Sequence, residues 1–359
     1  QRQMCIRDSY YTMPHNHDEE ILFLGPAGRG GMRSVIDAYA TVFDPFKIIF
    51  TQKEGSTAKK LLVGVASMSQ FIWRLLTDRK IKVVHVHVAY GMSFYRKRAF
   101  LNVASFFGKK TVFHSHGSQF QEFYAANPDA VRATLGRVDA VIALSDFWKD
   151  FFESKGCNNV TVIRNPVQSP RIDRRPINDG RVHLAFVGLI GERKGCFDIV
   201  KMAEKYRSQL SGKVMIHMAG NGDGERLQAD IDRLGLADVI SYEGWADAEK
   251  KASLLNASDI YFLPSHNEGV PISILEGMTY GLPVIATPVG GVASVVHEGE
   301  NGLLVPPGDI DRMYQAIMTL ASDPELRKSM GVRSLEISRD YLVENVKKEL
   351  DAFYDRLLK

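Results

Sequence analysis

Residues 266–277 read His-Asn-Glu-Gly-Val-Pro-Ile-Ser-Ile-Leu-Glu-Gly and place two carboxylates, Glu268 and Glu276, eight residues apart. The apolar run just before them, residues 258–265, is typical of a short buried strand. Pro271 suits the first turn of a helix, because its missing N–H needs no partner there. Glu268 then lies in a loop and Glu276 on the helix, with about 7.5 Å of helix rise between Pro271 and Glu276.

The layout of these two carboxylates fits an extended ligand that has hydroxyl groups at both ends and an anion between them. A helix start carries free N–H groups and partial positive charge, so the amides near Val270, Ile272 and Ser273 would face a pyrophosphate. Carboxylates suit polyols and repel phosphate. The alternative is that Glu268 is an acid favoured by the helix dipole and that Glu276 is a solvated helix residue.

The residues that follow favour the ligand-binding interpretation. Gly281 ends the helix, a buried strand follows, and Gly290-Gly291 and residues 301–309 continue the pattern. This run resembles the donor-binding half of the retaining glycosyltransferases of family 4, which have the GT-B fold and a Glu-x7-Glu pattern. That pattern falls on Glu268 and Glu276, and the resemblance extends over about residues 20–359.

The resemblance implies roles for the residues of this stretch. Glu268 is expected to contact the hydroxyls of the transferred sugar as a catalytic residue, and Glu276 to bind the ribose diol. The remaining donor-binding residues expected here are Gly269, Val270, Pro271, Ile272 and Ser273.

A second loop, residues 186–195, reads Phe-Val-Gly-Leu-Ile-Gly-Glu-Arg-Lys-Gly and combines a strand, a turn at Gly188 and two cations. Cations there can neutralise a leaving diphosphate. The family usually has Arg directly after the first Gly and Lys before the last. Lys194 matches, whereas Leu189 occupies the Arg position, and our hypothesis is that Arg193 substitutes. The alternative is a surface turn.

Two weaker signals concern the same ligand. Residues 24–33 form a strand and a glycine loop, and by resemblance Gly30 and Gly31 face the diphosphate and the acceptor. Alone, this loop could equally indicate a dinucleotide-binding fold, although it lacks the Gly-x-Gly-x-x-Gly spacing. The nucleobase is expected near the strand-end loop that contains Gly244 and Trp245.

Two histidine pairs, at positions 85 and 87 and at positions 114 and 116, alternate along strands, so each pair could reach one cleft. By resemblance His116 touches the donor sugar, whereas His85 is expected to be structural. We assign His87, His114, Arg96 and Lys97 to acceptor binding. The basic run that holds Arg96 and Lys97 is equally consistent with a solvated surface.

Metal binding is not expected. No carboxylate or thiol completes a ligand set around the histidines. The Asp-x-Asp strings at 230–232 and 309–311 do not directly follow strands; the first lies in a helical segment, and Asp309 is expected to cap a helix. We predict that the protein needs no cofactor.

Strand and helix patterns alternate through two series, which predicts an α/β fold of the GT-B type. It has two Rossmann-like parallel-sheet domains that face a cleft, and a C-terminal helix that crosses back to the first domain. A chain of 359 residues exceeds one usual core. The expected parts are a non-native or disordered segment (1–19), the acceptor-binding domain (20–168), a linker (169–181), the donor-binding domain (182–340) and the crossover helix (341–359). Residues 3–9 resemble translated sequencing-adapter read-through.

Charge is distributed unevenly, with 20 Lys and Arg against 10 Asp and Glu in residues 21–165, but 20 against 26 in residues 181–359. Such asymmetry can indicate an anionic surface or partner. Residues 59–80 place apolar bulk between basic ends and could form an interfacial membrane helix. The alternative is a core-packed amphipathic helix with solvated lysines. No aromatic and basic interleaving indicates nucleic acid.

Three scattered cysteines argue against a disulfide framework, and no export signal or spanning segment is apparent, so a cytoplasmic protein is expected, possibly at the inner face of the plasma membrane. The resemblance implies a retaining, metal-independent transferase that moves a hexosyl unit from UDP- or GDP-hexose to a hydroxyl of a lipid-linked or cell-envelope glycan. The alternatives are a GT-B phosphorylase or epimerase, or a non-catalytic sugar-nucleotide-binding subunit.

Overall fold

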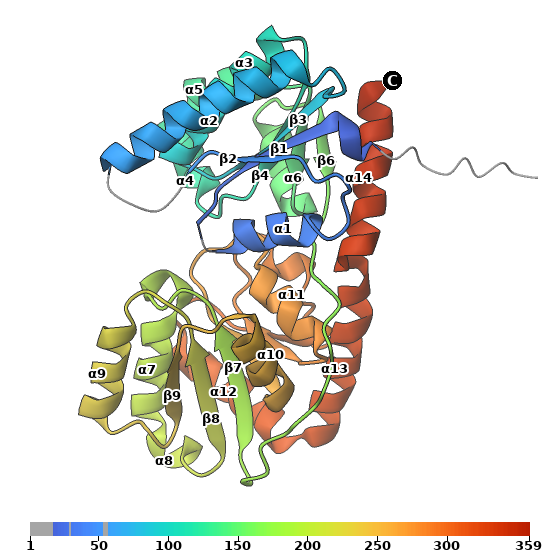
Figure 1. The fold of residues 1–359 in the computed structure, drawn as a ribbon. Coiled ribbons are helices and arrows are strands. Elements are labelled where there is room, and N and C mark those ends of the chain that lie inside the picture. The colour runs from blue at the N-terminus through green and yellow to red at the C-terminus, as the bar shows by residue number, and fades with distance from the viewer. Residues whose placement is uncertain (1–16, 29, 53–56) are drawn as a thin grey trace, which may run out of the picture.

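The computed structural model describes residues 17–28, 30–52 and 57–359, with the side chains of residues 57–61 left out. It contains two parallel sheets of six strands each, one above the other in Figure 1. The strands of the N-terminal sheet are β1 (Ile21–Gly25), β2 (Ile48–Phe50), β3 (Val83–Val88), β4 (Lys110–Ser115), β5 (Ala140–Ala143) and β6 (Val160–Val162). Those of the C-terminal sheet are β7 (Val182–Val187), β8 (Val214–Ala219), β9 (Ile240–Gly244), β10 (Ile260–Leu263), β11 (Val284–Ala286) and β12 (Gly302–Leu304).

The strand orders are β2-β1-β3-β4-β5-β6 and β12-β11-β10-β7-β8-β9. The predicted α/β fold with two parallel sheets is therefore confirmed. In open parallel sheets, ligands bind beyond the carboxyl ends of the strands, where the strand order reverses. In the C-terminal sheet that point lies between β7 and β10, the strands that precede the predicted cation loop and the Glu-x7-Glu stretch.

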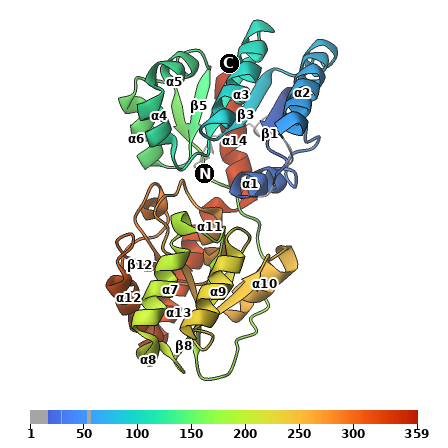
Figure 2. The same cartoon turned by 90° about the vertical axis from the view of Figure 1, so that its left-hand side faces the viewer.

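Helices cover both faces of each sheet (Figures 1 and 2). In the N-terminal half they are α1 (Gly31–Tyr39), α2 (Thr57–Thr77), α3 (Met92–Phe106), α4 (Phe120–Ala126), α5 (Pro128–Leu135) and α6 (Asp146–Ser154). In the C-terminal half they are α7 (Cys196–Lys205), α8 (Arg207–Leu210), α9 (Gly224–Leu234), α10 (Ala248–Ala257), α11 (Ile272–Thr279), α12 (Ile310–Ser322) and α13 (Pro324–Ser338). Asp309 caps α12 by accepting a hydrogen bond from the Arg312 amide at 2.9 Å, as predicted.

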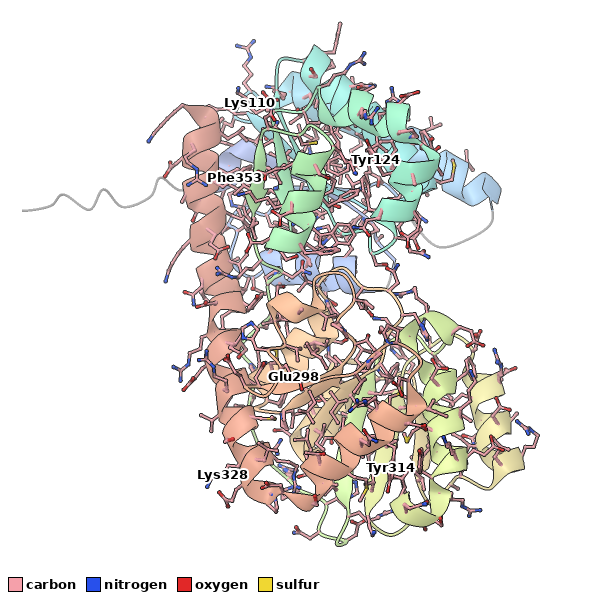
Figure 3. The ribbon with its side chains drawn as sticks, turned by 180° about the vertical axis from the view of Figure 1, so that it is seen from behind. Lys110, Tyr124, Glu298, Tyr314, Lys328 and Phe353 are labelled. Carbon is pink, nitrogen blue, oxygen red and sulfur yellow. The ribbon has the colours of Figure 1, made fainter. Side chains whose placement is uncertain are left out.

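The last helix, α14 (Val343–Leu358), returns to the N-terminal half, and Phe353 marks this part of it in Figure 3. Its apolar side chains Leu350 and Tyr354 are fully buried and join one continuous core. That core includes Phe23 of the N-terminal sheet and the inner residues of the C-terminal sheet, such as Phe262. The expected crossover helix is thus present, and it joins one face of the N-terminal sheet to the C-terminal half in one apolar cluster. A second cluster, which includes Leu24 and Val86, lies on the other face of the N-terminal sheet.

Part of the segment expected to be non-native or disordered, residues 1–19, has a defined structure. Residues 1–16 lie outside the described residues, but residues 17–19, assigned to the non-native or disordered segment, are ordered. Asp18–Glu20 is a 3-10 turn, and the Asp18 side chain is 4% exposed. His17 contacts Asp355 on α14 through its Nε2 at 2.8 Å. The sequence pattern did not predict that residues 17–19 are ordered, because Asp355, the partner of His17, lies 338 residues further along the chain.

A buried charge cluster holds this turn against α14. Lys347 Nζ lies 3.0 Å from Asp18 Oδ1 and 2.5 Å from Asp351 Oδ1, and it also stands over the ring of Phe43 at 4.4 Å. Burial raises the pKa of the Asp351 carboxyl, and the Lys347 ammonium opposes that shift. One cation therefore serves two buried carboxylates from opposite ends of the chain.

Two strand-like contacts tie together the segments that connect the halves. The Val167 amide donates to the Tyr341 carbonyl at 2.8 Å, and the Val343 amide donates to the Val167 carbonyl at 2.9 Å. Residues 168–181, which include the predicted linker 169–181, contain neither helix nor strand.

We expect Lys347→Met to lower the free energy of unfolding by about 3 kcal/mol, because it removes the ammonium that contacts two buried carboxylates. Lys348→Met, on the exposed side of the same turn, should change it by less than about 0.5 kcal/mol. Urea unfolding of both variants measures the difference. Equal stability of the two variants would show that the Asp18 and Asp351 contacts do not hold the N-terminal turn.

Candidate active site

A cavity of about 660 Å³ opens between the carboxyl ends of the two sheets. The N-terminal half contributes the loops after β1 and β4, with Gly30, Gly31 and His116. The C-terminal half contributes the loops after β7, β8, β9 and β10, and the start of α11. Among the described residues that line it, four are cations (Arg33, Arg193, Lys194 and Lys251) and two are carboxylates (Glu268 and Glu276). The wall therefore carries a net positive charge, which suits an anionic ligand.

Glu268 lies in the loop after β10 and is 6% exposed. Its backbone is held tightly, since a Cβ at Gly290 would lie 1.8 Å from the Glu268 carbonyl oxygen. Gly290 also has φ +57°, a conformation that side-chain-bearing residues rarely adopt. The Gly290-Gly291 turn thus allows the close approach that places Glu268 in the cavity wall.

Two consecutive cations reach Glu268 from the loop after β7. Lys194 Nζ lies 2.5 Å from Glu268 Oε1, and the Arg193 guanidinium lies 3.9 Å from the same oxygen. Arg193 also donates to the Asn267 carbonyl at 2.9 Å. Gly195 follows with φ +72°, and a Cβ there would lie 2.1 Å from the Pro264 carbonyl oxygen, so the loop packs directly on the end of β10. Leu189 lines the same cavity, 46% exposed.

Helix α11 begins at Ile272 with Pro271 as its N-cap, so Pro271 precedes the first turn in which the sequence had placed it. The first hydrogen bond inside this turn runs from the Ile274 amide to the Pro271 carbonyl at 3.1 Å. The amides of Ile272 and Ser273 come before it, and both residues line the cavity. Glu276 lies one turn further on and lines the cavity as well. Its Oε1 forms an ion pair with Lys251 of α10.

Most of the predicted site residues meet in this one cavity. Among those that line it are Glu268, Lys194, Arg193, His116, Glu276, Gly269, Val270, Pro271, Ile272, Ser273, Gly188, Trp245, Gly30 and Gly31. Gly244 does not line it, although its neighbour Trp245 does.

Direct acceptor contact by His87, His114 and Lys97 is wrong. His87 and His114 are 0% exposed and Lys97 is 1% exposed. On the face of β3 that carries His85 and His87, the ring of His87 packs against Tyr39 of α1, and His85 contacts the Tyr354 hydroxyl of α14. Strand alternation grouped these histidines correctly, but it could not show that this face of the sheet is buried. Arg96 is half-buried and donates to Gln52, which does line the cavity.

The four histidines form two hydrogen-bonded pairs. His85 Nδ1 lies 2.6 Å from the Tyr354 hydroxyl, and His85 Nε2 lies 2.9 Å from His114 Nδ1. His87 Nδ1 lies 2.8 Å from His116 Nε2, and His116 stands at the cavity wall. Burial lowers the pKa of His85 and of His116 to about 3, and it holds the pKa of His87 and His114 well below the usual range. The prediction that His85 is structural is therefore confirmed.

These histidines also form the one group with metal-ligand spacing that the described residues offer. Donor atoms of His85, His87 and His114 lie within 4.8 Å of one another. Both ring nitrogens of His85 already have partners, so coordination would break a hydrogen bond to Tyr354 or His114. The donor set fits a hydrogen-bond network better than a metal centre.

Sequence reasoning missed several residues that line the cavity. Lys251 comes from α10, and only its tertiary contact with Glu276 marks it. Asn165 donates through Nδ2 to the Val270 carbonyl at 2.8 Å and so links the two halves behind the α11 loop. Asn267, which does not line the cavity, donates to Glu122 of α4 at 3.1 Å and links the halves again. An Asn before the proline-rich segment was visible in the sequence, but its partner was not.

Comparisons with known proteins add independent findings. Residues 169–335 match the family model described as glycosyl transferases group 1, and residues 45–170 match the model described as Glycosyltransferase Family 4. The putative colanic acid biosynthesis glycosyltransferase WcaL of Salmonella typhimurium is 24% identical over 253 residues, which cover 67% of this chain and 62% of that protein. The chain thus spans a little less than two thirds of the length of that relative.

Solved structures share the fold over almost the whole chain. HepE of Anabaena in complex with UDP aligns with a TM-score of 0.76 at 18% identity, over 94% of this chain and 100% of that chain. The apo form of the lipopolysaccharide outer core galactosyltransferase WaaB aligns with a TM-score of 0.66 at 20% identity, over 94% of this chain and 99% of that chain. At these identities the likeness shows the fold alone, which is the predicted GT-B arrangement.

We expect the imidazoles of His85, His87, His114 and His116 to stay neutral between pH 5 and pH 8 in the folded protein. In the unfolded chain these imidazoles should titrate at about pH 6.5. The unfolded state then binds more protons below that pH, so the free energy of unfolding should fall as the pH drops from 7 to 5. Nitrogen-15 spectra of the rings across this range, with the urea-unfolded chain as control, test the prediction. A ring of this cluster that titrates near pH 6.5 in the folded protein would contradict it.

Proposed function

The chain belongs to the group 1 and family 4 glycosyltransferases, and from that premise we propose that it transfers a hexosyl unit from UDP- or GDP-hexose to a hydroxyl of a lipid-linked or cell-envelope glycan. We further propose that the anomeric configuration is retained and that no metal ion takes part. One observation carries the proposal: Glu268 and Glu276 face the same cavity on either side of the free amides at the start of α11.

The proposed donor pose follows from the charges of the wall. The diphosphate lies against the amides of Ile272 and Ser273, where a helix start favours negative charge. Glu276 accepts hydrogen bonds from the ribose hydroxyls, and Glu268 does so from the hydroxyls of the hexose. UDP is bound by the structurally similar HepE, which supports a nucleoside diphosphate ligand of this size.

The proposed reaction needs no protein base. The acceptor hydroxyl forms a bond to the anomeric carbon on the face from which the nucleoside diphosphate departs, and the leaving phosphate oxygen takes the hydroxyl proton. Lys194 and the α11 amides stabilise the negative charge that develops on that oxygen. Arg193 adds a second cation, because Leu189 occupies the position where the family usually has an arginine. Since Lys194 also contacts Glu268 at 2.5 Å, one side chain connects the sugar end and the phosphate end of the site.

A cell-envelope acceptor is supported by the named relatives. WcaL is described as a colanic acid biosynthesis glycosyltransferase, and WaaB as a lipopolysaccharide outer core galactosyltransferase. These descriptions concern those proteins, and the acceptor of this chain is our proposal. A lipid-linked acceptor would require the enzyme to approach the inner face of the plasma membrane.

Helix α2 offers a surface for that approach. Within the described part of the chain, every helix is too short or too polar to cross a bilayer. On α2, however, Phe71 and Leu75 are buried in the core while four apolar side chains face solvent, namely Leu62, Val65, Trp73 and Leu76. Each of these four is at least 60% exposed. The side chains of Lys59 and Lys60, which the sequence analysis also assigned to this surface, lie outside the described ones.

The exposed residues at the carboxyl end of α2 complete the surface. Arg79 and Lys80 follow Trp73 and Leu76 and are exposed. An apolar stripe beside cations fits an anionic membrane, where the rings enter the headgroup region and the cations meet lipid phosphates. We propose that α2 rests on the membrane in this way.

The function is tested by the release of nucleoside diphosphate from a panel of UDP- and GDP-sugars, with and without membrane lipid extract. We expect release from one donor class that persists in EDTA and is lost in Glu276→Ala. Lys194→Ala should lower kcat by about 100-fold or more, since it removes charge stabilisation from the transition state. Arg193→Ala should lower kcat by about tenfold or more for the same reason.

The matched control for these cation variants is Arg233→Ala, which removes an exposed arginine of the same half and should leave turnover unchanged. Unaltered kinetics in Arg193→Ala would reject its role as the second cation. Activity abolished by EDTA and restored by Mn or Mg would reject metal independence. Donor binding without release under any acceptor condition would favour the non-catalytic subunit, and release of a sugar phosphate in place of nucleoside diphosphate would favour a phosphorylase.

We expect the double variant Trp73→Ser and Leu76→Ser to lower binding to phosphatidylglycerol vesicles by about tenfold or more, because two large apolar side chains no longer enter the headgroup region. Val332→Ser, which removes an apolar side chain of α13 that is 52% exposed, is the control and should bind as the native protein does. Vesicle sedimentation measures both. Unchanged binding of the double variant would reject α2 as the membrane-facing surface.

A further inference from the structure

Lys251 stands in the first turn of α10 and forms an ion pair with Glu276, which lies 25 residues further along the chain. Both side chains line the cavity, and they are only 28% and 22% exposed. Within the described residues, Lys251 is the cation that lies within salt-bridge distance of Glu276, whereas Lys194 and Arg193 approach Glu268. Each carboxylate of the cavity thus has a cation of its own.

The position of Lys251 is fixed by how α10 begins. The Asp247 side chain caps this helix by accepting from the Lys250 amide at 2.9 Å, and the Lys251 amide donates to the Asp247 carbonyl at 2.9 Å. Lys250 Nζ reaches back to the Glu243 carbonyl oxygen in β9. The Asp247 cap therefore fixes the first turn of α10, which places Lys251 in the cavity wall, whereas Lys250 does not line the cavity.

We propose that Lys251 is a positioning residue that orients the Glu276 carboxylate for the two ribose hydroxyls of the donor, and so sets the preference of the site for ribonucleotides over deoxyribonucleotides. This inference rests on the proposed function. Lys251 occupies Glu276 Oε1, which leaves Oε2 to accept hydrogen bonds from the ligand. A glutamate side chain has several rotamers to lose on binding, and a partner that fixes one of them beforehand lowers that cost.

The positive charge of Lys251 also supports its role as a positioning residue for Glu276. The carboxylate of Glu276 would repel the diphosphate of a donor that binds beside it. The Lys251 ammonium offsets that repulsion and leaves the hydrogen-bond accepting capacity of Oε2 intact. A lysine that only added positive charge to the cavity would strengthen the binding of every nucleoside diphosphate equally, with or without ribose hydroxyls. The two roles therefore differ in what they predict for sugar selectivity.

The experiment compares the affinities of UDP and GDP, and of their 2′,3′-dideoxy forms, by calorimetry for the native protein and three variants. Lys251→Met removes the cation, Lys251→Arg keeps it, and Lys250→Met is the matched control, since it removes the neighbouring lysine of the same turn. We expect the native protein to prefer the ribonucleotide by about tenfold or more, as a charge-assisted hydrogen bond would give. In Lys251→Met that preference should fall to about threefold or less, because the affinity for the ribonucleotide should fall more than the affinity for the dideoxy form.

Lys251→Arg and Lys250→Met should both keep the native preference, and thermal unfolding should confirm that all three variants fold. An unchanged preference in Lys251→Met, or an equal loss of affinity for both forms, would overturn the inference and leave the proposed function standing. A native protein that binds neither nucleoside diphosphate would overturn the proposed function as well.

Discussion

The continuous apolar core that α14 carries from one sheet to the other holds the cavity in place. Leu350 and Tyr354 are fully buried beside Phe23, and the same cluster extends through the C-terminal sheet to Phe262. In each parallel sheet, the carboxyl ends of the strands lie on the same side. Because these two sides face each other, the loops that follow the strands of both sheets line a single cavity. Each side chain of the site owes its position to this packing and to the short loop that carries it.

Within the cavity, each carboxylate lies beside at least one cation. The proposed ligand needs carboxylates for its hydroxyls and cations for its phosphates, and the two kinds of group must lie within a few ångströms of each other. Lys194 lies beside Glu268 and Lys251 beside Glu276, and in the proposed pose these cations offset the repulsion between the carboxylates and the diphosphate. The amides at the start of α11 supply the remaining positive potential without adding a mobile side chain.

Much of this was accessible from the sequence, and the parts that were not share a cause. The strands, the loop position of Glu268, the helical position of Glu276 and the cap at Asp309 follow from local patterns, and the structure agrees with them. Lys251 and the ordered turn at Asp18 depend on partners far along the chain, which periodicity does not show. His87 and His114 were placed on the right strands, but only the packing of the two halves, with Tyr39 and Tyr354 beside these strands, shows that both histidines are buried.

The paired hydrogen bonds between Val167 and residues 341 and 343 have a mechanical consequence. The chain passes between the two halves at these two places, and the bonds fasten them side by side. Because the shared apolar core and the hydrogen bond from Asn267 to Glu122 also join the two halves, a change in the width of the cavity must disturb all of these contacts together.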